Sequence, residues 1–149
     1  MEGLIYTGKK EEAAQLFFDG YNCSQSVVAA FSEDFGVPKD VALKFSEGLG
    51  GGVGRMRDMC GAVTGMAIVL SMRYGSADLN DKDNKAKVYA LVQQAADKFK
   101  EKYSSLYCRD LIGVKRTTPV PDERTAEFYK KRPCAVLVAV AAEILAEMI

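Results

Sequence analysis

The sequence GLGGGVGRMRDMCGAVTGMAIVL, residues 48–70, joins a glycine-rich run to a long apolar segment. Five of the seven residues from 48 to 54 are glycine, and glycines at this density destabilise both helices and strands. From about Arg57 onward, apolar side chains leave little polar face, which is typical of a buried helix. The stretch therefore predicts a glycine-rich loop that leads into the central, most buried helix of the protein.

The rest of the chain also has helical periodicity. Apolar residues recur at helical spacing almost throughout, and no segment shows the sustained alternation of a β-strand. We expect one all-α domain over residues 1–149, a bundle of about five to seven helices. Further helices are predicted at 9–19, 23–35, 39–47, 80–103, 122–130 and 133–148, with a short turn or helix at 108–112 and a loop at 113–121.

The composition narrows the possible functions. Twenty basic residues balance twenty acidic ones, so the broad positive field of a protein that binds nucleic acid or an anionic membrane is missing. The chain has no histidine, which excludes a Ser-His-Asp triad. Residues 1–12 lack the order of a signal peptide, and the apolar segment 135–149 is too short to span a membrane. We therefore expect a cytoplasmic protein without membrane insertion.

Four cysteines remain as candidates for chemistry, and each lies where a helix is predicted to begin: Cys23, Cys60, Cys108 and Cys134. A helix N-terminus carries roughly half a positive charge and free N–H donors, which favour a thiolate. Asn22 and Gln25 form a weak capping-box signal around the first cysteine. Each of the other three cysteines has an arginine within three residues in the sequence, and these cations would further favour a thiolate: Arg57, Arg109 and Arg132.

Small residues surround the second cysteine. The glycine run would let backbone amides approach a bound group closely. After Cys60, two glycines four residues apart share one helix face, so another backbone or a cofactor could come close to the sulfur. The candidate site therefore also includes Gly50, Gly51, Gly52, Gly61, Ala62 and Gly65.

The cysteine spacing leaves three hypotheses open. Consecutive cysteines are 37, 48 and 26 residues apart, so no two form a Cys-x-x-Cys unit, and any joint site must be assembled by the fold. The first hypothesis is thiol–disulfide exchange or electron transfer with a redox partner protein or a small thiol, which requires no cofactor. In it Cys60 is the activated thiolate, and Cys23 is the first choice to resolve the mixed disulfide.

The second hypothesis is a zinc ion or an iron–sulfur cluster held by all four thiolates, which suits soft metals but lacks closely spaced cysteine pairs. The third is a non-catalytic helical module that binds a small molecule or a membrane-protein partner, with its cysteines as part of the core. Substitution of each cysteine by alanine distinguishes this module from a redox protein, because core cysteines contribute to stability and redox cysteines to reactivity.

A family resemblance favours the first hypothesis. The segments GYNCSQ at 20–25 and CGAVTG at 60–65, the glycine run, Cys108 and Cys134 together resemble the redox-active protein family named for its C_GCAxxG_C_C cysteine pattern. This resemblance implies a small protein that uses four cysteines in redox chemistry and is often encoded near transporter genes, hence a possible transporter-associated partner. One local difference is that Met59 precedes Cys60 and Gly61 follows it.

Overall fold

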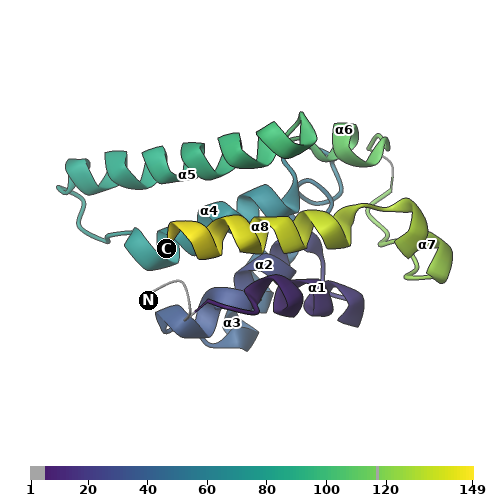
Figure 1. Ribbon diagram of the computed structural model, residues 1–149, viewed down its shortest axis with the longest axis horizontal. Helices are drawn as coiled ribbons and strands as arrows, with labels where there is room; N and C mark the ends of the chain where they lie inside the picture. Colours follow the sequence, from purple (N-terminus) through teal and green to yellow (C-terminus); the bar gives the residue numbers. More distant parts are fainter. Residues whose placement is uncertain (1–5, 117) are drawn as a thin grey trace.

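The computed structural model describes residues 6–116 and 118–149, and these form an all-α single domain (Figure 1). The all-α prediction is confirmed, although the described chain has eight α-helices where five to seven were expected. The helices are α1 (Lys9–Asp19), α2 (Cys23–Ser32), α3 (Lys39–Ser46), α4 (Gly61–Tyr74), α5 (Lys82–Tyr103), α6 (Cys108–Ile112), α7 (Ala126–Lys131) and α8 (Cys134–Met148). Short 3-10 turns, Glu33–Phe35 and Glu47–Leu49, follow α2 and α3.

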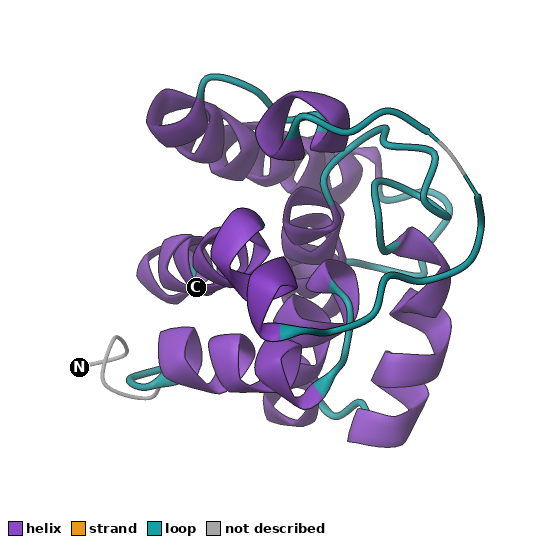
Figure 2. Ribbon diagram, turned by 90° about the vertical axis from the view of Figure 1, so that its right-hand side faces the viewer, coloured by secondary structure: helices purple, strands orange, loops and turns teal. Residues whose placement is uncertain are grey.

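The helices are arranged around α2, α4 and α8. Helix α2 packs against α1, α3, α4 and α8, whereas α5 packs against α4 and α8 from the other side. Figure 1 shows α5 as the outermost long helix, with α6 and α7 at the end of the molecule where α8 begins. In the view onto that end, the long connections gather in front of the helices (Figure 2). This loop-rich end is where the site is built.

The most buried helix is α2 rather than α4. Every residue of α2 after Cys23 is buried, whereas α4 buries half of its residues. The difference follows from side-chain size, because the serines and alanines of α2 let four neighbouring helices approach it from all sides. The glycine run is a loop as predicted, except that Gly48 and Leu49 belong to a 3-10 turn.

Helix α4 begins at Gly61, four residues later than predicted. The segment before it is held extended by an isolated antiparallel bridge between Met59 and Tyr107. In this bridge the Cys60 N–H donates to the Leu106 carbonyl at 2.8 Å. The Arg57 and Asp58 carbonyls likewise accept from the N–H groups of Arg109 and Cys108, so this segment pairs with residues 106–109 instead of forming a first helical turn.

Helix α7 also begins later than predicted, at Ala126 instead of residue 122. The Thr125 side chain accepts a hydrogen bond from the Phe128 N–H and caps this helix. Asp122, which the sequence placed in the first turn, instead lies in the preceding loop, where arginine side chains hold it. A local capping signal thus set the true start of the helix.

None of the described helices is both long and apolar enough to cross a membrane. The argument against a signal peptide used residues 1–12, of which residues 1–5 lie outside the described part of the chain. Residue 117, within the predicted loop at 113–121, also lies outside it.

Candidate functional site

The cysteine-bearing helix starts meet at the loop-rich end of the bundle. Cys23, Cys108 and Cys134 are the first residues of α2, α6 and α8, and Cys60 is the N-cap of α4. The predicted placement at helix starts is confirmed. Three of these four residues line a pocket of about 530 Å³, whereas Cys60 is buried and does not line it. All four are free thiols.

Cys23 and Cys134 both line the pocket, and each affects the pKa of the other. The capping box predicted from Asn22 and Gln25 is present and fixes the start of α2 at Cys23. The hydrogen bond from the Cys23 thiol lowers the pKa of Cys134 from about 9 to about 7, and nearby arginines, led by Arg132, assist against the opposing effect of burial. The same hydrogen bond, together with burial, raises the pKa of Cys23 well above the usual thiol value. Of the two thiols, Cys134 is therefore the one that ionises more readily.

Cys60 and Cys108 lie on either side of the bridge between Met59 and Tyr107. The Cys108 N–H donates to the Asp58 carbonyl at 2.7 Å, so both cysteines are anchored by main-chain bonds to the opposite segment. Burial raises the pKa of Cys60 to about 12, although backbone N–H groups of α4 oppose the shift. Burial also raises the pKa of Cys108, against the effect of the Arg57 guanidinium 3.7 Å away. These raised pKa values do not favour Cys60, the expected activated thiolate, in that role.

Two glycines are required where segments approach these cysteines. A Cβ atom at Gly52 would lie 2.7 Å from Cys108 Cβ and 2.6 Å from the Asp58 nitrogen. Gly52 also has a φ of 70°, in the left-handed region. At Gly61 an added Cβ would lie 3.0 Å from Cys23 Cβ, so this residue lets α4 pack directly on the start of α2. The close approach predicted around the second cysteine thus serves packing between helices.

The remaining small residues of the candidate set are also packing positions. A Cβ at Gly65 would lie 2.9 Å from Val27 Cβ, and Ala62 is fully buried. Gly50 lies against the Asn22 side chain, and Gly51 lies against Arg55. Both Gly50 and Gly51 line the pocket, where they support the capping residue and an arginine beside the thiol pair.

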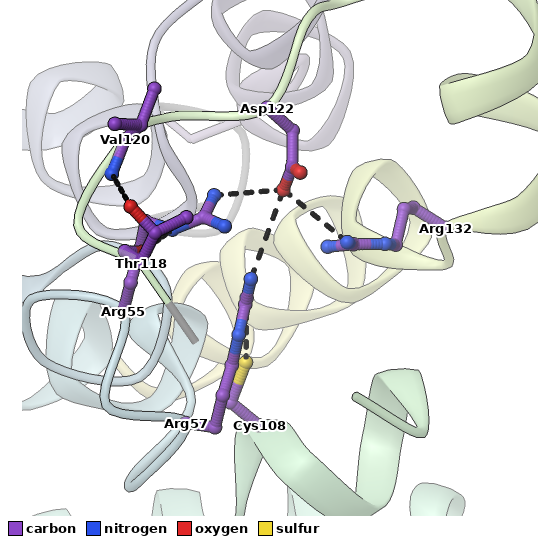
Figure 3. A network of polar contacts seen from close by, with 7 residues as sticks. All are labelled: Arg55, Arg57, Cys108, Thr118, Val120, Asp122 and Arg132. Carbon is purple, nitrogen blue, oxygen red and sulfur yellow. Dashed lines mark hydrogen bonds and ion pairs between the residues drawn. The ribbon is translucent and has the colours of Figure 1, made fainter. Parts of the chain in front are cut away.

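Three arginines converge on one carboxylate oxygen at the pocket (Figure 3). Asp122 Oδ2 lies 2.9 Å from Arg55 Nη1, 3.3 Å from Arg132 Nη2 and 3.7 Å from Arg57 Nη2. We call these four residues the arginine cluster. Burial opposes ionisation of Asp122, but the Arg55 hydrogen bond and the charges of all three arginines outweigh it and lower the pKa of the carboxyl.

The predicted arginines do not all act on the cysteine beside them in sequence. Arg57 contacts Cys108 instead of Cys60. Arg109 donates to the Arg57 carbonyl and stacks on Tyr107 outside the pocket. Only Arg132 acts as predicted, by lowering the pKa of Cys134.

Sequence reasoning missed Asp122 and Arg124. Arg124 lines the pocket, donates to the Phe17 and Tyr21 carbonyls and lies 4.1 Å from the centre of the Phe17 ring. Both residues follow the breakers Pro119 and Pro121, and a proline-flanked loop with an aspartate and an arginine was the only local signal for them.

The metal hypothesis gains no support from the arrangement of these side chains. Among the described residues, no three cysteine, aspartate or glutamate side chains are grouped in a way that could hold a metal ion. Cys23, Cys108 and Cys134 line the pocket, and Cys60 and Cys108 each follow a residue of the bridge between Met59 and Tyr107.

The cysteine pattern also matches a known family. No curated protein and no solved structure matches the chain. A family model described as "Putative redox-active protein (C_GCAxxG_C_C)" matches residues 21–148, which include all four cysteines and the glycine run. The chain therefore belongs to the C_GCAxxG_C_C family of redox-active proteins.

Proposed function

We propose that Cys134 and Cys23 perform thiol–disulfide exchange, with Cys134 as the attacking thiolate and Cys23 as the resolving thiol. The observations that support this most directly are that both residues line the pocket at helix starts, and that the pKa of Cys134 is lowered to about 7 while that of Cys23 is raised. A thiol with a pKa near the ambient pH combines a high thiolate fraction with good nucleophilicity. Both residues line the pocket, so a substrate there reaches them.

The exchange proceeds in two steps. The Cys134 thiolate attacks one sulfur of a substrate disulfide, a bond forms between protein and substrate, and the second substrate sulfur leaves with the electron pair of the broken bond. Once Cys134 is no longer an anion, the main cause of the raised Cys23 pKa disappears. The Cys23 proton passes to the departing thiolate, and the Cys23 thiolate then attacks Cys134 Sγ. The products are a Cys23–Cys134 disulfide, one substrate thiol and one substrate thiolate, which takes a proton from the solvent.

Cys60 and Cys108 take no part in this exchange. Cys60 does not line the pocket, and the pKa of both thiols is raised, chiefly by burial, although Cys108 lines the pocket as Cys134 does. A neutral thiol is a poor nucleophile. Cys60 contributes to the hydrophobic core, and the Cys108 N–H donates to the Asp58 carbonyl across the bridge.

Site-resolved alkylation and disulfide mapping test the proposal. The reduced native protein is treated with iodoacetamide at graded pH, and mass spectrometry follows each cysteine. Cys134 should titrate lowest, near pH 7. A small disulfide should then produce a Cys23–Cys134 bond, and C23S should stop at the mixed disulfide on Cys134. The matched control C60A should still form the bond.

Several outcomes would overturn the proposal. If a cysteine other than Cys134 titrates lowest, the nucleophile is misassigned. If oxidation joins Cys60 or Cys108 to Cys23 or Cys134, the proposed pairing is wrong. If no disulfide forms and each substitution only lowers stability, the cysteines are core residues of a helical module that binds a small molecule or a transporter-associated partner.

A further inference from the structure

The pocket beside the thiol pair contains more basic than acidic side chains. Four arginines line it, together with only two carboxylates, those of Asp122 and Glu47. Glu47 is exposed, whereas Asp122 is already shared among Arg55, Arg57 and Arg132. One carboxylate cannot neutralise three guanidinium groups, so the pocket keeps an excess of positive charge that attracts anions.

Arg57 provides an independent indication of a missing anionic partner. The residue is only 3% exposed, yet within the described part of the chain its Nε and Nη2 have no hydrogen-bond acceptor. Nη2 lies 3.7 Å from Asp122 Oδ2, which is an ion-pair distance but too long for a hydrogen bond. A buried guanidinium with unused donors is costly unless a further acceptor is bound. Figure 3 shows Arg57 between Cys108 and Asp122, with Nη2 toward the carboxylate.

The position of this charge relative to the thiolate suggests what binds there. Arg132 is two residues before Cys134 and lowers its pKa, and the charges of Arg124 and Arg57 act in the same direction. A molecule whose acidic group contacts these arginines would thus have its neighbouring atoms beside the Cys134 sulfur. The volume of about 530 Å³ is in the range of small-molecule pockets.

We propose that the substrate of this site is a small disulfide bearing an acidic group, which Arg57 and Arg132 bind while Cys134 attacks the nearer sulfur. This inference rests on the proposed thiol–disulfide exchange and adds the chemical class of its substrate. The reaction is balanced as before: the substrate S–S bond breaks, a Cys134–substrate bond forms, and the leaving thiolate takes the proton released by Cys23.

A series of disulfides of similar length and different charge tests the substrate class. The reduced protein is mixed with anionic 3,3′-dithiodipropionate, neutral bis(2-hydroxyethyl) disulfide or cationic cystamine, and formation of the mixed disulfide on Cys134 is timed by acid quench and mass spectrometry. Each rate is divided by that of 2-mercaptoethanol with the same disulfide, which removes intrinsic reactivity. We expect the anionic probe to exceed the cationic one at least tenfold at low salt and the difference to shrink at 1 M salt.

Variants locate the effect in the pocket. R132Q should reduce the preference for the anionic probe several-fold, whereas D122N should increase it, because the internal carboxylate no longer occupies the arginines. R116Q is the matched control, since Arg116 is exposed and does not line the pocket. R57Q removes the buried guanidinium itself. If R57Q does not fold, the opposite effects of R132Q and D122N still decide the question.

The thioether 3,3′-thiodipropionate separates the two proposals, because it has the same acidic groups but no disulfide. It should protect Cys134 of the wild-type protein from iodoacetamide. Equal normalised rates for all three disulfides, without protection by the thioether, would overturn the anionic substrate and leave thiol exchange intact. Protection without reaction of any disulfide at Cys134 would overturn thiol exchange and retain the anion site.

Discussion

The two pairs of cysteines share a structural position but differ in environment. All four lie at helix starts, yet only Cys134 has a lowered pKa. At Cys134 a hydrogen bond and several arginines outweigh burial, whereas at Cys60 and Cys108 burial outweighs the backbone N–H groups and Arg57. The comparison teaches that a helix N-terminus alone does not activate a thiol, because desolvation of the anion exceeds the effect of a few aligned donors.

The largest expected difference is between Cys134 and Cys60 of the native protein at pH 7. With pKa values of about 7 and about 12, the thiolate fraction of Cys134 exceeds that of Cys60 by about five orders of magnitude. The Cys60 thiolate is the stronger nucleophile, which reduces the difference in rate by about two orders of magnitude. We expect iodoacetamide to modify Cys134 at least about 300-fold faster. The Cys134 rate should rise with pH through about 7 and level off by about pH 8.

Mass spectrometry of each modified cysteine measures this difference. In urea the four rates should converge, because every thiol then regains an ordinary pKa. A native ratio below about tenfold would show that the two environments do not differ in the way that their burial and charges indicate.

The second prediction concerns the glycine-rich loop, in which Gly52 lies against Cys108. In G52A the new Cβ would meet Cys108 Cβ and the Asp58 main chain within 2.8 Å, at a φ of 70°. We expect a loss of about 2–3 kcal/mol in the free energy of unfolding and faster modification of Cys108. G54A is the matched control, since its φ of 57° is also left-handed but its nearest neighbour is 3.9 Å away.

Urea unfolding of both variants measures the effect. G54A should lose only about 1 kcal/mol, the cost of the left-handed backbone without a collision. Equal losses in the two variants would mean that contact with the bridge contributes nothing to the requirement for glycine at position 52.

The third prediction sharpens the role of the hydrogen bond between Cys23 and Cys134. C23A removes the donor that is the largest cause of the lowered Cys134 pKa, so this pKa should rise from about 7 toward 9. Modification of Cys134 at pH 7 should then slow about five- to tenfold, because the lost thiolate fraction is partly offset by greater nucleophilicity. C23S keeps a hydroxyl donor and should retain most of the shift. An unchanged pH–rate profile in C23A would assign the shift to the arginines alone.

The helix starts were predictable because their signals are local. Asn22 and Gln25 lie within one turn of Cys23, and their side chains form the capping box that their spacing indicates. Most other helix bounds differ by only a few residues for the same reason. Helices α4 and α7 both begin four residues later than predicted. The cause at α4 is long-range, since residues 57–60 pair with residues 106–109, about fifty positions along the chain.

The chemistry of the thiols was not predictable in the same way. Arg57 is three residues from Cys60 in sequence but contacts Cys108, 51 residues away. Asp122 has the local sequence of a first-turn acid, yet it ion-pairs with arginines from two other segments. Burial of Cys60 depends on the packing of several helices around it. The pairing and the pKa values of the cysteines depend on such long-range contacts, whereas sequence spacing indicates only which residues share the same helical turn.

The smallest expected effect distinguishes sequence proximity from spatial proximity among the arginines. Arg132 and Arg109 each lie within two residues of a cysteine, but only Arg132 is among the causes that lower a thiol pKa at the pocket. In R132Q the Cys134 pKa should rise slightly, and modification at pH 7 should slow about two- to threefold, since the charge acts through a partly solvated pocket. R109Q should leave the Cys134 rate unchanged, because the Arg109 side chain stacks on Tyr107 away from the pair. The pH–rate profile of Cys134 at low salt measures both variants.

At 1 M salt the wild-type protein should approach R132Q, because screening removes the charge effect while the hydrogen bond from Cys23 remains. Equal slowing in R109Q and R132Q would mean that a general positive field, and not the position of Arg132, separates the two cysteine pairs.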